Sequence, residues 1–130
     1  AFFPTATILD ESAVAAIPTV TRAELATWQD DGRPLLLIEA LPEMFYRKVH
    51  LPGAINIPLE TFDERIAALA IAPDVTVVVY CAHLACRNSA IAASRLIDLG
   101  YSNVFDYAEG KQDWVDAGLP TERVSGNASI

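Results

Sequence analysis

Short apolar runs that alternate with segments of helical periodicity are the feature that most constrains how this chain can fold. PLLLIEA (residues 34–40) and VTVVVY (residues 75–80) are almost wholly apolar, as expected of strands buried on both faces of a sheet. Two shorter runs, INIP (residues 55–58) and NVFDY (residues 103–107), also have strand character. Strands that alternate with helices are typical of an α/β fold with a mostly parallel sheet.

Two helices are predicted by their capping residues. Thr21 with Glu24, and Thr61 with Glu64, have the three-residue spacing of a capping box. In that motif a hydroxyl and a carboxylate satisfy backbone amides at the helix start. Apolar residues follow at helical spacing in both segments, and Gly32 ends the first one.

A third helix is predicted over NSAIAASRLIDLG (residues 88–100). Helical spacing places Ala92, Leu96 and Leu99 on one side of it, and Gly100 stands at the position that ends many helices. Further short helices are predicted over PEMFYRKV (residues 42–49) and GKQDWVDAG (residues 110–118).

The composition indicates one folded domain. The chain has 130 residues, of which 52% are hydrophobic and 20% are charged, enough to build a core. Both ends are rich in small residues, so we expect an N-terminal extension at residues 1–17, a domain at residues 18–123 and a C-terminal tail at residues 124–130. The N-terminus has no basic region and does not resemble an intact signal peptide, so we expect a cytoplasmic protein.

Charge and residue types exclude several classes of partner. The net charge is −8 and the nine basic residues are scattered, which argues against binding to nucleic acid or to anionic membranes. The apolar runs are far shorter than the roughly 20 residues of a membrane span. Only His50 and His83 could join the cysteines as metal ligands, and C-x4-C is not a typical zinc pair. We therefore expect neither a metal nor another cofactor.

Cys81 stands where a parallel sheet places its binding sites. It directly follows an apolar strand, and the next helical segment begins near residues 87–89. Sites in such sheets lie at the carboxyl ends of strands, next to helix N-termini. Backbone amides and the helix dipole there favour a thiolate or a bound anion, and Arg87 would add a positive charge. From these residues alone, Cys81 is either an activated nucleophile or a buried core cysteine.

Three neighbours of Cys81 have more than one interpretation. Cys86 is filler at the helix start, a second thiol that condenses with an oxidised Cys81, or itself a nucleophile. Ser89 is either the helix N-cap or a hydrogen-bond donor to the sulfur. His83 is expected to be an exposed loop residue rather than a proton donor.

Three ordered stretches resemble the signatures of the rhodanese-like domain, over roughly residues 18–123. Residues 35–59, LLLIEALPEMFYRKVHLPGAINIPL, resemble a strand that ends in an acid, an aromatic helix and the family's HIPGAINIP. Residues 77–110, VVVYCAHLACRNSAIAASRLIDLGYSNVFDYAEG, resemble the active-site strand, its loop and the following helix, and EGKQDW resembles the closing Gly-Gly-Trp signature. The resemblance implies an α/β fold with a central, mostly parallel five-stranded sheet flanked by helices.

The resemblance also implies a chemistry. In catalytic members a cysteine takes a sulfane sulfur from a donor such as thiosulfate, and passes it from a persulfide to cyanide or a thiol. By position it makes Cys81 the nucleophile and Glu39, where the family usually has aspartate, a residue that helps order the loop and the helix behind it. The implied partners are a small sulfur-containing donor and a thiol, cyanide or protein acceptor. The implied substrate-binding loop consists of Ala82, His83, Leu84, Ala85, Cys86, Arg87, Asn88 and Ser89.

This loop departs from the family's C-x4-R-S pattern. Counted from Cys81, Arg87 comes one residue late; counted back from the helix, Asn88 takes the arginine's place. C-x5-R is also the spacing of cysteine phosphatases, and rhodanese-type phosphatases and arsenate reductases have this longer loop. Tyr80, however, stands where phosphatases usually place a histidine.

Three hypotheses therefore remain open from the sequence. They are a sulfurtransferase, a phosphatase or arsenate reductase, and a non-enzymatic redox or binding module in which Cys81 and Cys86 form a disulfide. Because Arg87 is the only permanent cation of a fairly apolar loop, we expect weak activity with the dianion thiosulfate and cyanide, or a protein or low-molecular-weight persulfide as the donor.

Overall fold

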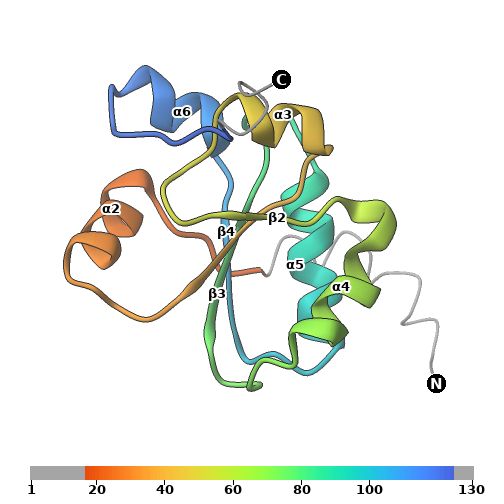
Figure 1. The fold of residues 1–130 in the computed structure, drawn as a ribbon. Helices are drawn as coiled ribbons and strands as arrows, with labels where there is room; N and C mark the ends of the chain where they lie inside the picture. The colour runs from red at the N-terminus through yellow and green to blue at the C-terminus, as the bar shows by residue number, and fades with distance from the viewer. Residues whose placement is uncertain (1–16, 125–130) are drawn as a thin grey trace.

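The sheet is parallel and has Cys81 at the carboxyl end of a central strand. A computed structural model describes residues 17–124, so the segments at residues 1–16 and 125–130 lie outside the described residues. Within that range four parallel strands pair in the order β2–β1–β3–β4 (Figure 1). They are β1 (Leu36–Glu39), β2 (Ile55–Asn56), β3 (Thr76–Tyr80) and β4 (Asn103–Tyr107). All five residues of β3 are buried, as its β-branched sequence predicts.

Helices cover both faces of this sheet, as expected of the α/β class. Their bounds are α2 (Arg22–Asp30), α3 (Glu43–Lys48), the 3₁₀ turn η1 (Leu59–Thr61), α4 (Phe62–Leu69), α5 (Asn88–Asp98) and α6 (Gly110–Asp116). None of the helices between residues 17 and 124 has the length and apolar character that a membrane-spanning segment requires.

The two faces of the sheet carry two separate cores. On one face, Ile66 of α4 and Leu96 of α5 belong to a buried cluster with Val77 and Val79 of β3. On the other face, the cluster contains Leu25 of α2 and Trp114 of α6, together with Val78 and Tyr80 of β3. The alternation along β3 thus directs successive side chains into opposite cores, as strand geometry requires. Both clusters extend to the carboxyl end of β3, where Cys81 follows.

The implied fifth strand is replaced by a single bridge. Thr19 pairs with Asp106 of β4 in an isolated parallel bridge. The Asp106 N–H donates to the Pro18 carbonyl at 2.9 Å, and the Val20 N–H donates to the Asp106 carbonyl at 3.1 Å. Pro18 has no N–H for a longer ladder, and α2 begins soon after at Arg22. The edge is therefore covered, but within the described residues the sheet has four strands rather than five.

One of the two predicted capping boxes is present. Thr21 Oγ1 accepts from the Glu24 N–H at 3.1 Å, and the Glu24 carboxylate accepts from the Thr21 N–H at 2.9 Å. The prediction of a capping box at Thr61 and Glu64 is wrong, because Thr61 makes no side-chain cap hydrogen bond. Thr61 is the last residue of η1, so the chain enters α4 through a 3₁₀ turn and not through an extended cap residue.

Gly100 ends α5 as predicted, but Leu99 does not lie on the buried side of the helix, where it was expected. Gly100 has φ +102°; its N–H donates to the Ile97 carbonyl at 3.0 Å, and the Tyr101 N–H donates to the Leu96 carbonyl at 3.1 Å. These are the two bonds of a Schellman motif. Leu96 is buried, whereas Leu99 is 50% exposed, because it stands beyond the last helical residue and leaves the buried stripe.

Helix α6 begins against the backbone that leaves β3. The Lys111 N–H donates to the Cys81 carbonyl and the Gln112 N–H to the Ala82 carbonyl, each at 2.9 Å. Gly110 makes this approach possible, because it has φ +76° and a Cβ there would lie 2.7 Å from the Cys81 carbonyl oxygen. The first amides of α6 therefore hold the backbone at the candidate nucleophile.

We predict that Gly110→Ala destabilises the fold much more than Gly118→Ala. Gly118 has nearly the same φ, +77°, but the space that a Cβ would occupy there is open. The control should therefore show only the left-handed backbone penalty, roughly 1–2 kcal/mol, while Gly110→Ala adds a clash of about 1–3 kcal/mol. Urea unfolding of both variants measures the difference. Equal losses would show that α6 is not packed closely against Cys81.

Candidate active site

Cys81 is buried between the end of β3 and the start of α5. Only 1% of the residue is exposed to solvent. The Ser89 N–H donates to Cys81 Sγ at 3.4 Å, and the Cys81 thiol donates to Ser89 Oγ at 3.5 Å. The backbone N–H of Ser89 is therefore the donor to the sulfur, and its hydroxyl oxygen is an acceptor. The residue at the N-cap position is Arg87, and it makes no side-chain cap hydrogen bond.

The Cys81 thiol is a weaker acid than an ordinary cysteine. Burial is the largest cause that raises its pKa, to about 11, and a hydrogen bond with the Cys86 thiol raises it further. The side chain and the backbone N–H of Ser89 lower it, but they do not offset burial. The N–H at the helix start favours the thiolate, as expected, but the desolvation of the charged form outweighs it in the resting state.

Cys86 is the second thiol of the site. It is half-buried, and both cysteines are free. Its N–H donates to the His83 carbonyl at 2.9 Å, which closes a turn and brings the chain back toward Cys81. Cys86 therefore belongs to the same short loop as Cys81, and its thiol is one of the causes that raise the pKa of Cys81.

The rest of the predicted loop divides into an exposed tip and an anchored end. His83, Leu84 and Ala85 are exposed, with Leu84 at 71%. The Asn88 side chain donates to the Ala40 carbonyl at 3.0 Å, so it fastens the start of α5 to the end of β1. Arg87 is exposed. Between residues 17 and 124 no ion pair or side-chain hydrogen bond of Arg87 is present, so no contact holds its guanidinium over the loop.

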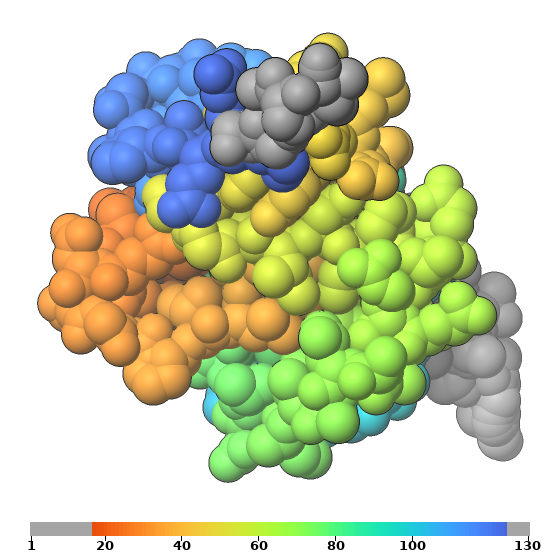
Figure 2. Space-filling view, viewed as in Figure 1, coloured from red at the N-terminus to blue at the C-terminus, as the bar shows by residue number. Residues whose placement is uncertain are grey.

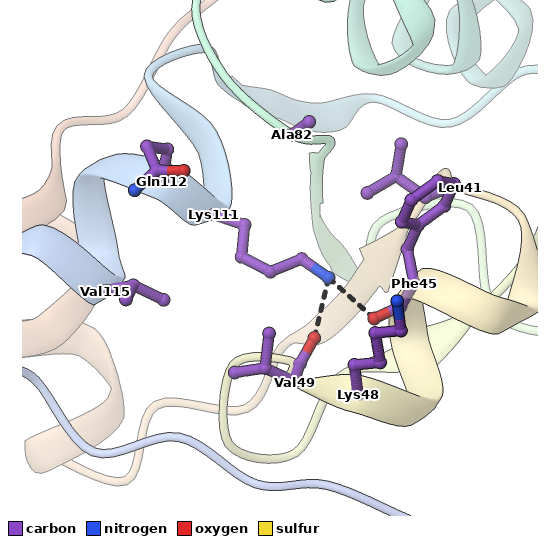
Figure 3. Close-up of a pocket in the computed structure, with 8 residues that line it drawn as sticks. All are labelled: Leu41, Phe45, Lys48, Val49, Ala82, Lys111, Gln112 and Val115. Atoms are coloured by element: carbon purple, nitrogen blue, oxygen red, sulfur yellow. Dashed lines mark hydrogen bonds between the residues drawn. The ribbon is translucent and has the colours of Figure 1, made fainter.

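Glu39 lies at the centre of a buried polar network below the site. Its side chain is fully buried, and Oε1 accepts from the Tyr80 hydroxyl at 2.6 Å. Oε2 accepts from Lys111 Nζ at 2.9 Å. Lys111 Nζ also donates to the Phe45 carbonyl at 3.0 Å and the Val49 carbonyl at 2.6 Å, as Figure 3 shows for these two bonds. The ends of β1, β3 and α3 are thus joined to the start of α6.

This network connects Glu39 to the backbone of the loop that it is predicted to order. Glu39 accepts a hydrogen bond from the Lys111 side chain, and the backbone N–H of Lys111 donates to the Cys81 carbonyl. Burial and the Glu39 carboxylate raise the pKa of Tyr80 far above its ordinary value, so Tyr80 remains a neutral donor. Sequence reasoning missed Lys111. An acid at the end of an apolar strand signals that some partner is needed, but nothing in the spacing says which basic residue supplies it.

Asp106 is a second buried acid that sequence reasoning missed. It is 6% exposed, and its Oδ1 has no hydrogen-bond partner among the described residues. Burial raises its pKa, and the side chain of Ser89 lowers it. Asp106 therefore lies behind the residue that contacts Cys81, on the α5 face of the sheet. Its position in a short strand of mixed residues gave no signal of this.

An apolar cavity of about 290 Å³ opens beside the loop, between α3 and α6. Those two helices lie at the same end of the molecule (Figures 1 and 2). The Lys111 ammonium donates to the carbonyls of Phe45 and Val49 (Figure 3), and Lys48 is an exposed lysine of the lining. The lining residues are Leu41, Phe45, Lys48, Val49, Ala82, Lys111, Gln112 and Val115.

Comparison with known proteins identifies the family and the fold. The rhodanese-like domain family matches this chain over residues 21–117. The thiosulfate sulfurtransferase PspE of Escherichia coli is 42% identical over 73 residues, which cover 56% of this chain and 66% of that protein. The transcriptional regulator Rv0324 of Mycobacterium tuberculosis is 34% identical over 103 residues, which cover 79% of this chain and 44% of that protein.

A solved structure agrees with these sequence matches. The thiosulfate sulfurtransferase of Pseudomonas aeruginosa superposes with a TM-score of 0.75 at 26% identity, over 85% of this chain and 21% of that one. The chain therefore spans less than half of the regulator and about a fifth of the Pseudomonas enzyme.

We predict that Cys86→Ala makes Cys81 react at lower pH. The variant removes a hydrogen bond that raises the pKa of Cys81, so the thiolate forms earlier as the pH rises. Ser89→Ala should have the opposite effect, because the Ser89 side chain lowers that pKa. The rate of Cys81 alkylation by iodoacetamide against pH, followed by peptide mass spectrometry, measures both shifts. Profiles that coincide with the wild type would contradict the thiol contact.

Proposed function

The chain belongs to the rhodanese-like domain family, and from this premise we propose that it is a sulfurtransferase in which Cys81 carries the transferred sulfur as a persulfide. The observation that carries the proposal is the position of the Cys81 sulfur, at the end of β3 and 3.4 Å from the first-turn N–H of Ser89. Sulfurtransferases among the relatives support the reaction class.

The reaction proceeds in two displacements. The Cys81 sulfur attacks the outer sulfur of a donor persulfide, the donor's sulfur–sulfur bond breaks, and the donor leaves as a thiol with the Cys81 proton. A persulfide anion on Cys81 remains. An acceptor thiolate then attacks the outer sulfur and regenerates the Cys81 thiolate. The Ser89 N–H stabilises negative charge at Cys81, and the α6 amides on the Cys81 and Ala82 carbonyls keep the loop in place.

The surroundings of Cys81 favour an organic persulfide over thiosulfate. The neighbouring cavity is lined mainly by apolar side chains. Lys111 is engaged by Glu39 and the α3 carbonyls. A donor that carries an organic group therefore has apolar side chains to pack against at this end of the molecule, whereas the dianion thiosulfate has no such group.

The oxyanion alternative has less support. A phosphatase or arsenate reductase needs an arginine fork fixed over the loop, and the Arg87 side chain is exposed with no partner among residues 17–124. The redox-module alternative needs a bond between the sulfurs of Cys81 and Cys86, which are both free cysteines in this structure.

We predict that Cys81 gains one sulfur atom from glutathione persulfide and less from thiosulfate. The reduced protein is incubated anaerobically with each donor, and its intact mass and the mass of the Cys81 peptide are measured. Because the wild-type persulfide has a second thiol beside it, Cys86→Ser is the variant in which the added sulfur should be seen most clearly. Cys81→Ser is the matched control. The proposal fails if Cys81→Ser gains as much sulfur as Cys86→Ser.

A further inference from the structure

The cavity between α3 and α6 has two half-exposed apolar walls. Phe45 of α3 is 44% exposed, Val115 of α6 is 40% exposed, and both line the cavity. Figure 3 shows Val115 and Gln112 on one side of it and Leu41 and Phe45 on the other. Apolar cavities of about 150 Å³ bind benzene, so the volume of about 290 Å³ here has room for one aromatic ring and a short chain. Burial of such a group between the two walls is favourable.

The cavity shares its lining with the backbone of the candidate nucleophile. Ala82, the residue after Cys81, lines it. Lys111 and Gln112 also line it, and their N–H groups donate to the Cys81 and Ala82 carbonyls at 2.9 Å. Consecutive Cα atoms lie about 3.8 Å apart, so a group bound against Ala82 is a close neighbour of Cys81. A persulfide attached to that group has only a short distance to reach the end of β3.

The two lysines of the chain both line this cavity, but only one of them has its charge balanced. Lys111 pairs with Glu39 at 2.9 Å and donates to two carbonyls of the α3 segment. Lys48 is exposed, and no ion pair within residues 17–124 includes it. Because the net charge of the chain is −8, an anionic ligand depends on a local cation of this kind. Lys48 is therefore the group in the lining that can bind a carboxylate.

We propose that this cavity binds the organic group of the sulfur donor, and that the donor is the persulfide of an apolar thiol with a single carboxylate. The inference rests on the proposed function, because it names the donor for Cys81. The apolar group packs between Phe45 and Val115, and the carboxylate pairs with Lys48. The sulfur chemistry is unchanged: the donor's sulfur–sulfur bond breaks, the outer sulfur stays on Cys81, and the organic thiol leaves with the Cys81 proton. Lys48, Phe45 and Val115 thus determine specificity and take no part in the bond changes.

This assignment ranks the organic donors. Glutathione persulfide is a polar peptide with several charges, so it reacts at Cys81 without filling the apolar cavity. A donor whose phenyl ring leaves water between the two walls gains the free energy of that burial, which corresponds to at least about a tenfold gain in affinity. An arylalkyl persulfide with a carboxylate should therefore load Cys81 at lower concentration than glutathione persulfide does.

Binding of 3-phenylpropanoate, which has no sulfur, tests the cavity apart from the chemistry. In an NMR titration of the reduced full chain, the amide signals of Ala82 and Val115 should shift and saturate. Val115→Phe fills the cavity and should abolish the shift at Ala82. Ile97→Phe is the matched control, because Ile97 is 43% exposed on α5 and does not line the cavity; it should bind like the wild type. Lys48→Gln should weaken binding about two- to fivefold, as expected for an exposed ion pair, and Arg33→Gln should not.

Sulfur loading then tests the donor class. The persulfides of 2-sulfanyl-3-phenylpropanoate and 2-sulfanylpropanoate differ only by a phenyl group, and the mass of the Cys81 peptide reports loading from each. At low concentration the wild type and Ile97→Phe should load at least about tenfold faster from the phenyl donor, and Val115→Phe should lose this preference. Glutathione persulfide is the reference donor.

The outcomes separate this inference from the proposed function. The inference is overturned if Ala82 and Val115 do not respond to 3-phenylpropanoate, if Val115→Phe binds it like the wild type, or if the two donors load the wild type equally. Sulfur transfer stands in each of these cases as long as glutathione persulfide loads Cys81. If no donor adds sulfur to Cys81, the proposed function itself fails, and the NMR titration still decides whether the cavity binds an aromatic carboxylate.

Discussion

The site depends on the contact between the start of α6 and the backbone after β3. Gly110 has a conformation that other residues adopt only with strain, and no Cβ separates it from the Cys81 carbonyl. The next two amides then bind the Cys81 and Ala82 carbonyls. Lys111 continues from the same turn into the interior and meets Glu39. One helix start therefore fixes the backbone of the candidate nucleophile and also closes the polar network below it.

The buried network is stable because all of its groups are partnered. Lys111 Nζ has three acceptors, and both oxygens of Glu39 accept hydrogen bonds. Loss of either charge would strand the other one in the interior, which typically destabilises a fold by about 3–5 kcal/mol. Asp106 is the contrast, since its Oδ1 has no partner among the described residues. The rigid network lies under Cys81, while the exposed tip at residues 83–85 faces solvent.

The strands, the first capping box and the position of Cys81 could be predicted from the sequence, because each depends on residues that are neighbours in the chain. The errors at Thr61 and Leu99 arose where a 3₁₀ turn or a helix end changed the direction of a side chain. The roles of Lys111 and Asp106 depend on contacts between distant segments, which spacing does not encode. The high pKa of Cys81 has the same origin, because burial is a property of the whole fold.

The central claim is that Cys81 carries sulfur in a cradle formed by the starts of α5 and α6. The most direct measurement is the crystal structure of Cys86→Ser after exposure to glutathione persulfide. The account predicts an additional sulfur bonded to Cys81 Sγ, with the Ser89 N–H still at the sulfur and the α6 amides still on the Cys81 and Ala82 carbonyls. An unmodified Cys81 in crystals whose protein has gained sulfur elsewhere would contradict it.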